Sequence, residues 1–212
     1  MIIRFLLILC TAISPLGLLH ADDAVLHAWL KIQPSILTLD AAFTQERKLP
    51  ALKNPTSTRG RLTFKKPDQF RWQLGEPAET LAISDGTTLT LIQTREKSAR
   101  QIPADSPQAS RFSMLTGKAF QSIESFNQAF EVTAWRVESG IHQYTLKPKD
   151  RRLQGQVPWI FLDIEPLQNT LTALEMMLQD KSRVRTIFDQ PQINKPTAPG
   201  LFQPDLSGLK VK

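Results

Sequence analysis

Strict alternation of apolar and polar residues in the first half of the chain is the feature that most constrains its fold. Phe70, Trp72 and Leu74 alternate with Arg71 and Gln73. Successive side chains of a strand point to opposite faces, so this period of two is typical of an antiparallel strand with one buried and one solvated face. The same period recurs at residues 39–44, 61–65, 81–83 and 89–91. The first half therefore predicts a set of antiparallel strands.

The rest of the chain adds further strands and a few helices. Apolar residues at helical spacing predict a helix over residues 23–37 that ends near Pro34, and residues 106–130 predict two short helices around Gly117. The proline-rich tail from Gln190 is predicted to be extended. Further strands are predicted at residues 130–138, 141–147, 157–164, 171–179 and 183–189.

About ten strands in one sheet must curl, and the concave face of a curled sheet has to be covered. Two or three short helices can cover such a hollow without filling it. A solid core and an apolar cavity are equally compatible with this pattern. The fold class predicted from pattern is thus mainly β with few helices, in a single domain that spans residues 22–212.

The first 21 residues have the features of a cleaved secretory signal. Arg4 gives a basic start, residues 5–9 open an apolar run that is too short to span a bilayer, and Ala21 ends the segment with a small residue. A retained membrane anchor is the alternative, but Pro15 and Gly17 interrupt the apolar run. We therefore predict cleavage after Ala21 and export of the remainder.

Cys10 is the one cysteine of the chain, and it would leave with the signal. It follows Leu-Ile-Leu rather than small residues, so we reject a lipoprotein cleavage site. An exported domain without disulfides has to be stabilised by its core. Loss of Arg4 lowers the formal net charge from +6 to about +5. Outside the cytoplasm this modest basicity suits anionic membrane surfaces or acidic partners, although the charge is spread evenly along the chain.

The sequence contains none of the motifs that mark common catalytic or metal sites. HExxH, GxSxG, a glycine-rich phosphate loop and Cys/His metal spacings are all absent from the chain. His27 and His142 are the histidines of the exported part, and neither belongs to a recognisable motif. We therefore predict no catalytic residue, no metal and no cofactor.

Asp163 and Glu165 raise the question of a catalytic pair of carboxylates, because they share one face of a predicted strand. We interpret them instead as solvent-facing acids opposite the apolar residues of that strand. Opposite charges on neighbouring strands attract each other, so we expect a partner in Arg183 or Arg185.

Binding of nucleic acid is disfavoured by the same alternation that predicts the sheet. Proteins that bind single strands place aromatic and cationic side chains around one groove. Phe70 and Trp72 have the opposite parity to Arg71, so they belong to the other face of the strand. We predict no nucleic-acid partner.

Three stretches of the chain resemble one known family. They are FTQE at residues 43–46, GRLTFKKPDQFRW at residues 60–72 and ISDGTTL at residues 83–89. In order and spacing they are similar to periplasmic outer-membrane lipoprotein carriers of the LolA type. The likeness covers roughly residues 22–92, with a weaker echo in FQP at residues 202–204 and Gly208.

The resemblance implies an incomplete, unclosed antiparallel β-barrel with an α-helical lid over an apolar cavity that binds the acyl chains of lipoproteins or other lipids. Such carriers receive lipid-modified proteins from an inner-membrane ABC-type release complex and deliver them to an outer-membrane receptor, without any chemical step. It thus implies a monomer in the periplasm of a Gram-negative bacterium that is not an enzyme.

Carried over onto this chain, the resemblance implies a cavity wall, a lid and a latch. Lys66 is the expected latch, because it stands where related carriers have an arginine that hydrogen-bonds the lid helices; lysine lacks the planar fork of arginine. The expected lid residues are Phe112, Met114 and Leu115. The expected lipid-binding wall consists of Phe43, Leu62, Phe64, Phe70, Trp72, Leu74, Ile83, Leu89 and Leu91.

Departures from the family pattern leave the cargo open. Lys66 replaces the arginine, and Thr90 and Ile92 stand where the related carriers have aromatic residues. A carrier of another lipid, such as a glycolipid or a lipid-linked pigment, is therefore a second hypothesis. A sensor or regulatory module that binds lipidated or misfolded proteins is a third. A hydrolase of acyl esters that depends on His142 is a fourth.

Overall fold

Strands are the main elements of the protein, whose computed structural model describes residues 20–106, 109 and 118–212. The strands are β1 Thr38–Lys48, β2 Thr56–Lys65, β3 Gln69–Leu74, β4 Thr80–Asp85, β5 Thr88–Gln93, β6 Ser98–Pro103, β7 Phe130–Glu138, β8 Ile141–Pro148, β9 Trp159–Glu165, β10 Thr170–Met177, β11 Arg183–Ile193 and β12 Lys210–Val211. The helical segments are α1 His20–Ile32, η1 Gln33–Ser35, η2 Lys118–Phe120, α3 Ile123–Ala129 and α4 Arg151–Gln156.

All the strands belong to a single 12-stranded sheet that curls without closing. Its order is β12-β6-β5-β4-β3-β2-β1-β11-β10-β9-β8-β7. The first strand, β1, thus pairs with the late strand β11 near the middle of the sheet. Neighbouring strands are antiparallel except for the short parallel pair β6–β12. The predicted unclosed, mainly β fold is confirmed.

The predicted elements agree with the observed ones where the apolar period is strong. The strands predicted between residues 130 and 189 correspond to β7–β11, and the first helix gives way to a 3-10 turn that contains Pro34. The sequence did not predict β6, α4 or β12. In β6, Ala99 and Ile102 point to opposite faces, and β12 has two residues, so neither produces an alternation.

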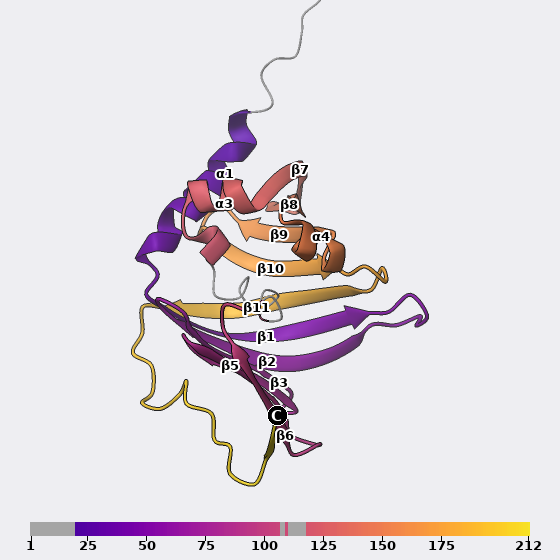
Figure 1. The fold of residues 1–212 in the computed structure, drawn as a ribbon. Helices are drawn as coiled ribbons and strands as arrows, with labels where there is room; N and C mark the ends of the chain where they lie inside the picture. The colour runs from indigo at the N-terminus through magenta and orange to yellow at the C-terminus, as the bar shows by residue number, and fades with distance from the viewer. Residues whose placement is uncertain (1–19, 107–108, 110–117) are drawn as a thin grey trace, which may run out of the picture.

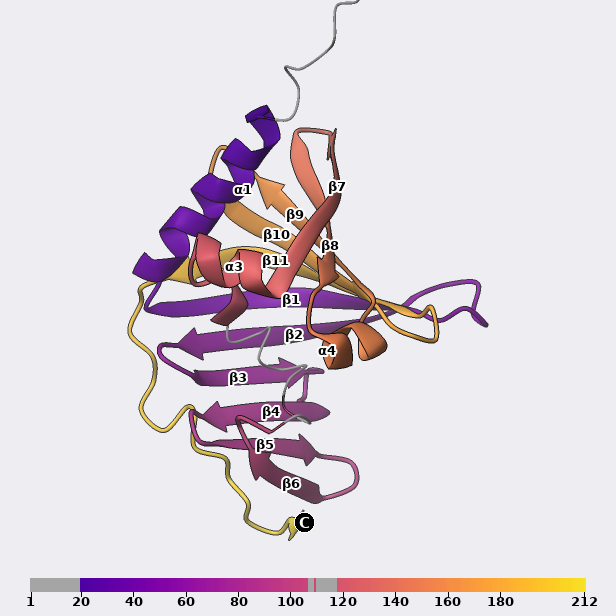
Figure 2. The ribbon, with the colours of Figure 1, turned by 45° about the horizontal axis from the view of Figure 1, so that its top comes forward.

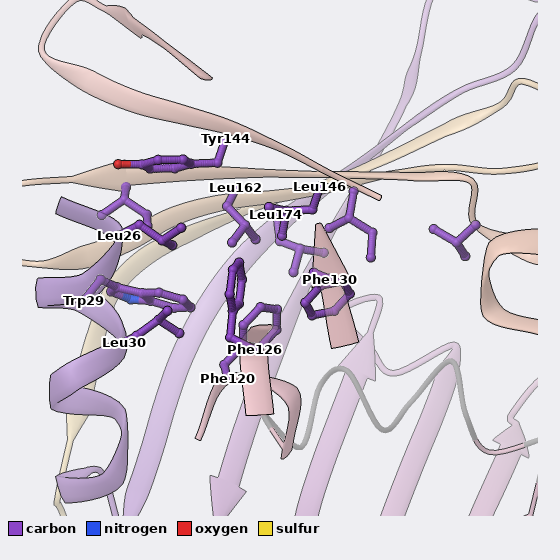
Figure 3. Close-up of a cluster of buried hydrophobic side chains, with 13 residues drawn as sticks. Leu26, Trp29, Leu30, Phe120, Phe126, Phe130, Tyr144, Leu146, Leu162 and Leu174 are labelled. Carbon is purple, nitrogen blue, oxygen red and sulfur yellow. The ribbon is translucent and has the colours of Figure 1, made fainter. Parts of the chain in front are cut away.

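Helices cover one face of the sheet, which we call the inner face (Figure 2). Two groups of apolar side chains are buried there. The helix cluster joins α1, η2 and α3 to β7–β10, and its main members are Leu26, Trp29, Leu30, Phe120, Phe126, Phe130, Tyr144, Leu146, Leu162 and Leu174 (Figure 3). The strand cluster lies on β1–β5, and its members on these strands are Phe43, Leu62, Phe64, Phe70, Trp72, Ala82 and Leu89.

Gly60 on β2 shows how tightly the strand cluster packs. It is the register partner of Phe43 on β1 and of Leu74 on β3. A Cβ at this position would overlap the Phe43 ring and the Gln73 carbonyl oxygen, so the absent side chain is what lets the ring lie flat on the sheet. Phe43 then contacts Trp72 with ring centroids 4.2 Å apart.

The opposite, outer face carries a group of charges on β9, β10 and β11, in which the two carboxylates are buried. Arg185 forms ion pairs with Asp163, at 2.5 Å, and with Glu175. Arg183 pairs with Glu175 and also lies over the Phe161 ring. The expected partner for Asp163 is therefore confirmed as Arg185. The expectation that Asp163 faces solvent is wrong, because the side chain is 5% exposed.

Glu165 takes no part in these ion pairs. Its carboxylate accepts hydrogen bonds from the backbone N–H groups of Leu167 and Gln168, at 2.9 and 2.7 Å. It therefore stabilises the turn between β9 and β10 and is not half of a pair with Asp163.

Candidate functional site

A cavity of about 220 Å³ lies on the inner face between α1 and the sheet. Its floor comes from β1, β2, β10 and β11, and its roof comes from α1, η1 and the residues of and next to η2. It thus lies where the helix cluster and the strand cluster meet, with Phe188 packed against both. The apolar lining consists of Trp29, Ile32, Ile36, Leu39, Ala41, Leu62, Phe64, Phe120, Leu171, Leu174, Phe188, Pro191 and Ile193.

The roof is positioned by the apolar face of α1. Leu26, Trp29 and Leu30 are spaced at three and four residues, which puts them on one side of the helix. Figure 3 shows these side chains directed towards Phe120 and Phe126, with the sheet beyond. The Trp29 and Phe120 rings meet edge to face, with centroids 5.5 Å apart. Phe120 therefore packs against α1 through Trp29, and both residues also line the cavity.

The lining also contains polar residues. They are Gln33, Lys66, Gln121, Gln168, Asn169 and Thr170. A mainly apolar wall with a few polar groups suits a ligand with an apolar body and a polar end. Small-molecule sites typically measure roughly 300–1,000 Å³, so the cavity in this state is small for a complete lipid.

Lys66 fastens the end of the roof to the sheet. Its Nζ donates hydrogen bonds to the carbonyl oxygens of Gln33, at 3.0 Å, and Pro34, at 2.6 Å. Carbonyl groups at the end of a helix lack partners within the helix and carry partial negative charge, so an ammonium group is well matched to them. Lys66 thus holds the segment that follows α1 at the edge of the cavity that it lines.

We expect Lys66→Gln to loosen this end of the roof. Loss of the two bonds to carbonyl oxygens should raise amide hydrogen exchange at Ile36 and Leu37 by about fivefold, which corresponds to about 1 kcal/mol. Lys66→Arg should keep exchange slow, because a guanidinium also donates. Lys65→Gln removes an exposed neighbouring cation and is the matched control. Equal exchange in all three variants would contradict a latch at Lys66.

Comparison with known proteins decides the family. Residues 35–205 match the family model described as "Outer membrane lipoprotein carrier protein LolA". The chain belongs to the LolA family. The match includes the cavity floor on β1, β2, β10 and β11, but it leaves out the whole of α1.

Individual relatives are similar at low identity. The chain is 26% identical over 159 residues to an outer-membrane lipoprotein carrier protein of Pseudomonas fluorescens, covering 71% of this chain and 70% of the relative. It is 28% identical over 160 residues, with the same coverage, to the protein of that name from Pseudomonas aeruginosa. An uncharacterised conserved protein from Thermus thermophilus shares the fold, with a TM-score of 0.53 at 7% identity over 90% of this chain and 97% of that one.

Most residues of the predicted wall lie on the inner face, but few of them line the cavity. Leu62 and Phe64 do so, and the expected latch residue Lys66 lines it as well. The others belong to the strand cluster or pack against it, namely Phe43, Phe70, Trp72, Leu74, Leu89 and Leu91. The cavity is therefore displaced from β3–β5 towards α1 and the pair β1–β11.

Ile83 is a correction, because it lies on the outer face. It is the register partner of Arg71 on β3 and of Thr90 on β5, and these residues have the parity opposite to Trp72 and Leu89. Its contacts are with an outer-face group formed by Ile92 and Ala99 and covered by Leu206 and Leu209 of the tail. The inner positions of β4 are taken by the small residues Ala82 and Ser84.

The predicted lid residues Phe112, Met114 and Leu115 lie outside the described residues. The roof contributed by α1 was not predicted as part of the site, although the sequence placed Trp29 and Ile32 on one helical face. The contribution of Phe188 on β11 was also missed. It has the same parity as Val184, so the alternation at residues 183–189 contained that signal.

Among the residues that the structure describes, no cluster of three or more His, Cys, Asp or Glu side chains could hold a metal ion. No helix in the same ranges is long and apolar enough to cross a membrane. The family description is that of a carrier, which agrees with the prediction that the protein is not an enzyme.

Proposed function

We propose that the protein is a periplasmic carrier that shields the acyl chains of lipoproteins in the cavity beneath α1 and moves them from the inner to the outer membrane. The observation that carries the proposal is a mainly apolar cavity roofed by a helix whose end is held by hydrogen bonds from Lys66 and Asn194. Membership of a family described as outer-membrane lipoprotein carriers supports the direction of transport.

Burial of acyl chains explains why a carrier is needed. Each buried CH₂ group contributes about 0.8 kcal/mol, so an acyl chain does not cross water unaided. The lining offers an apolar surface instead of water. Release has to remain possible, and a roof whose end is held by a few hydrogen bonds, two of them from Lys66, meets this requirement.

The size of the cavity implies that loading involves movement of the roof. A space of about 220 Å³ holds part of a lipid, so the rest requires α1 to shift from the sheet or the chain to extend along the inner face. For the second route, the apolar side chains next to the cavity are those of the strand cluster on β1–β5, which are buried in this state. An inner-membrane release complex and an outer-membrane receptor would be the partners, with the carrier acting as a monomer.

A binding experiment tests the proposal. Purified residues 22–212 should take up a fluorescent fatty acid at one saturable site, and a di- or triacylated lipopeptide should displace it. A water-soluble peptide of the same sequence without acyl chains is the control and should not compete. No saturable uptake would overturn the proposal.

The identity of the cargo has its own measurement. Mass spectrometry of lipids that co-purify from the periplasm should find acylated peptides if the protein serves lipoproteins. Recovery of a glycolipid or a lipid-linked pigment instead would keep the cavity as a lipid site but replace the cargo. Hydrolysis of the bound ester, lost in His142→Ala, would identify an enzyme and contradict the carrier.

A further inference from the structure

A second hollow, on the outer face, has charged side chains in its lining. It is a groove of about 580 Å³ between the convex side of β1–β3 and the segment that follows β11. Figures 1 and 2 show this C-terminal tail leaving β11 and running past the strands to reach β6. The groove is separated by the sheet from the cavity beneath α1, so its chemistry is independent of acyl-chain binding.

Arg71 is the unusual residue of this groove. It is half-buried on β3, and burial lowers the pKa of its guanidinium. Across the described part of the chain its side chain forms neither a hydrogen bond nor an ion pair, although a guanidinium has five N–H donors. A half-buried guanidinium whose donors have no protein partner is available to bind an anionic ligand.

The carboxylate of the groove is already engaged. Asp40 accepts from Nε of Arg61, at 2.9 Å, and from its Nη2, and it also accepts from Oγ1 of Thr63 at 2.9 Å. The charges of Asp40 and Arg61 therefore cancel each other. Asp40 and Arg71 are the register partners of Thr63 on either side, which puts them about 10 Å apart across two strand spacings.

Lys195 supplies the second uncompensated cation from the opposite wall. Its backbone is fixed, because its carbonyl oxygen accepts from Oγ1 of Thr38 at 2.7 Å. Asn194 beside it donates to the Ser35 carbonyl oxygen at 3.0 Å and accepts from the backbone N–H of Leu37 at 2.7 Å. These hydrogen bonds hold the tail in place where it forms the groove. Of the charged side chains that line the groove, one is negative and three are positive, so their net charge is +2.

We propose that this groove binds a phosphate monoester, with Arg71 as the bidentate donor and Lys195 as the second cation. A phosphate monoester carries about −1.5 to −2 charges at pH 7, which matches the two cations left over. The planar fork of arginine fits two phosphate oxygens, and lysine contributes a point charge. The hydroxyl of Thr63 and the amides of Gln73 and Gln192 then face the organic part of the ligand.

Calorimetric titration with glycerol 3-phosphate at low ionic strength tests this assignment. Wild-type protein should bind it, whereas glycerol should give no signal. Arg71→Gln should weaken binding by about tenfold to a hundredfold, and Lys195→Gln by about threefold to tenfold. Arg59→Gln removes an exposed cation of β2 that does not line the groove, and it should bind like wild type.

Two further measurements complete the test. One distinguishes loss of the phosphate site from misfolding, and the other distinguishes a soluble ligand from a lipid headgroup. Arg71→Lys keeps the charge without the fork and should bind with intermediate affinity; fluorescent fatty-acid uptake should be unchanged in every variant. Vesicles of phosphatidylcholine with phosphatidic acid present the same group on a membrane. Recruitment to these vesicles that glycerol 3-phosphate competes away identifies a lipid headgroup, and binding of glycerol 3-phosphate without recruitment identifies a soluble ligand.

Three results would overturn the site. They are absence of glycerol 3-phosphate binding by wild-type protein, equal binding by Arg71→Gln, and preference for succinate over glycerol 3-phosphate. The first leaves the acyl-chain cavity untouched, since that cavity lies on the other face and has its own ligand.

Discussion

Ala41→Phe should weaken uptake of a fluorescent fatty acid by about fiftyfold while leaving the fold intact. Ala41 is on the inner face of β1, is 2% exposed and lines the cavity beside Leu62. A phenylalanine ring directed into a space of about 220 Å³ displaces ligand rather than protein. Exclusion of three CH₂ groups costs about 2.4 kcal/mol, which corresponds to roughly fiftyfold in Kd.

A graded series and a matched control separate cavity filling from damage to the fold. Ala41→Leu should have a smaller effect than Ala41→Phe, because it occupies less of the space. Ala82→Leu adds the same atoms at another inner-face alanine, on β4, that does not line the cavity. It should lower stability by about 1–3 kcal/mol through overpacking while uptake is retained. Wild-type uptake by Ala41→Phe would show that acyl chains bind elsewhere.

The location of this cavity marks the limit of what the sequence could predict. Alternation shows which side chains share a face, because successive side chains of a strand point to opposite faces of the sheet and one of these faces is solvated. The inner-face positions of Phe64, Phe70, Trp72 and Leu89 were predicted in this way. Whether these side chains fill the hollow or line a space depends on where α1 crosses the sheet. That crossing is set by contacts of Trp29 with Phe120, which lie far apart in the chain.

The misassignment of Ile83 has a related cause. Apolar residues on β4 occupy the outer parity, because Leu206 and Leu209 from the tail cover that part of the convex face. The tail is more than a hundred residues away in sequence, and its apolar residues follow no period. Where the tail covers the outer face, that face also carries apolar residues, so an apolar side chain is no sign of the inner face. Alternation alone therefore assigned Ile83 to the wrong face.

Asp163 shows the same limit for polar residues. Its face was predicted correctly, and so was a partner among Arg183 and Arg185, although β10 lies between β9 and β11 and the register pairs Asp163 with Ala173. Its burial was not predicted, because the long side chains that cover it come from β10 and β11. Burial is what turns this ion pair from a marginal surface contact into a determinant of stability.

Arg185→Met should therefore lower the free energy of unfolding by about 3 kcal/mol. The change leaves the buried carboxylate of Asp163 without its partner, while Glu175 keeps Arg183. Burial alone would lower the pKa of Arg185, but its hydrogen bond with Asp163 and the charges of Asp163 and Glu175 outweigh this and raise the pKa. Chemical denaturation of the purified domain measures the loss, and a fall in Tm of roughly 10 °C should accompany it.

The double variant decides whether the loss comes from an unpaired charge or from lost packing. Asp163→Asn in the Arg185→Met background removes the uncompensated charge without a change of shape, so it should recover most of the lost stability. Arg95→Met breaks the ion pair with Glu79, whose side chains are 82% and 49% exposed, and should cost well under 1 kcal/mol. If Arg185→Met and Arg95→Met cost the same, the buried group on β9–β11 contributes no more than a surface pair. If the double variant is as unstable as Arg185→Met alone, packing of the arginine stem over the sheet, and not its charge, stabilises this face.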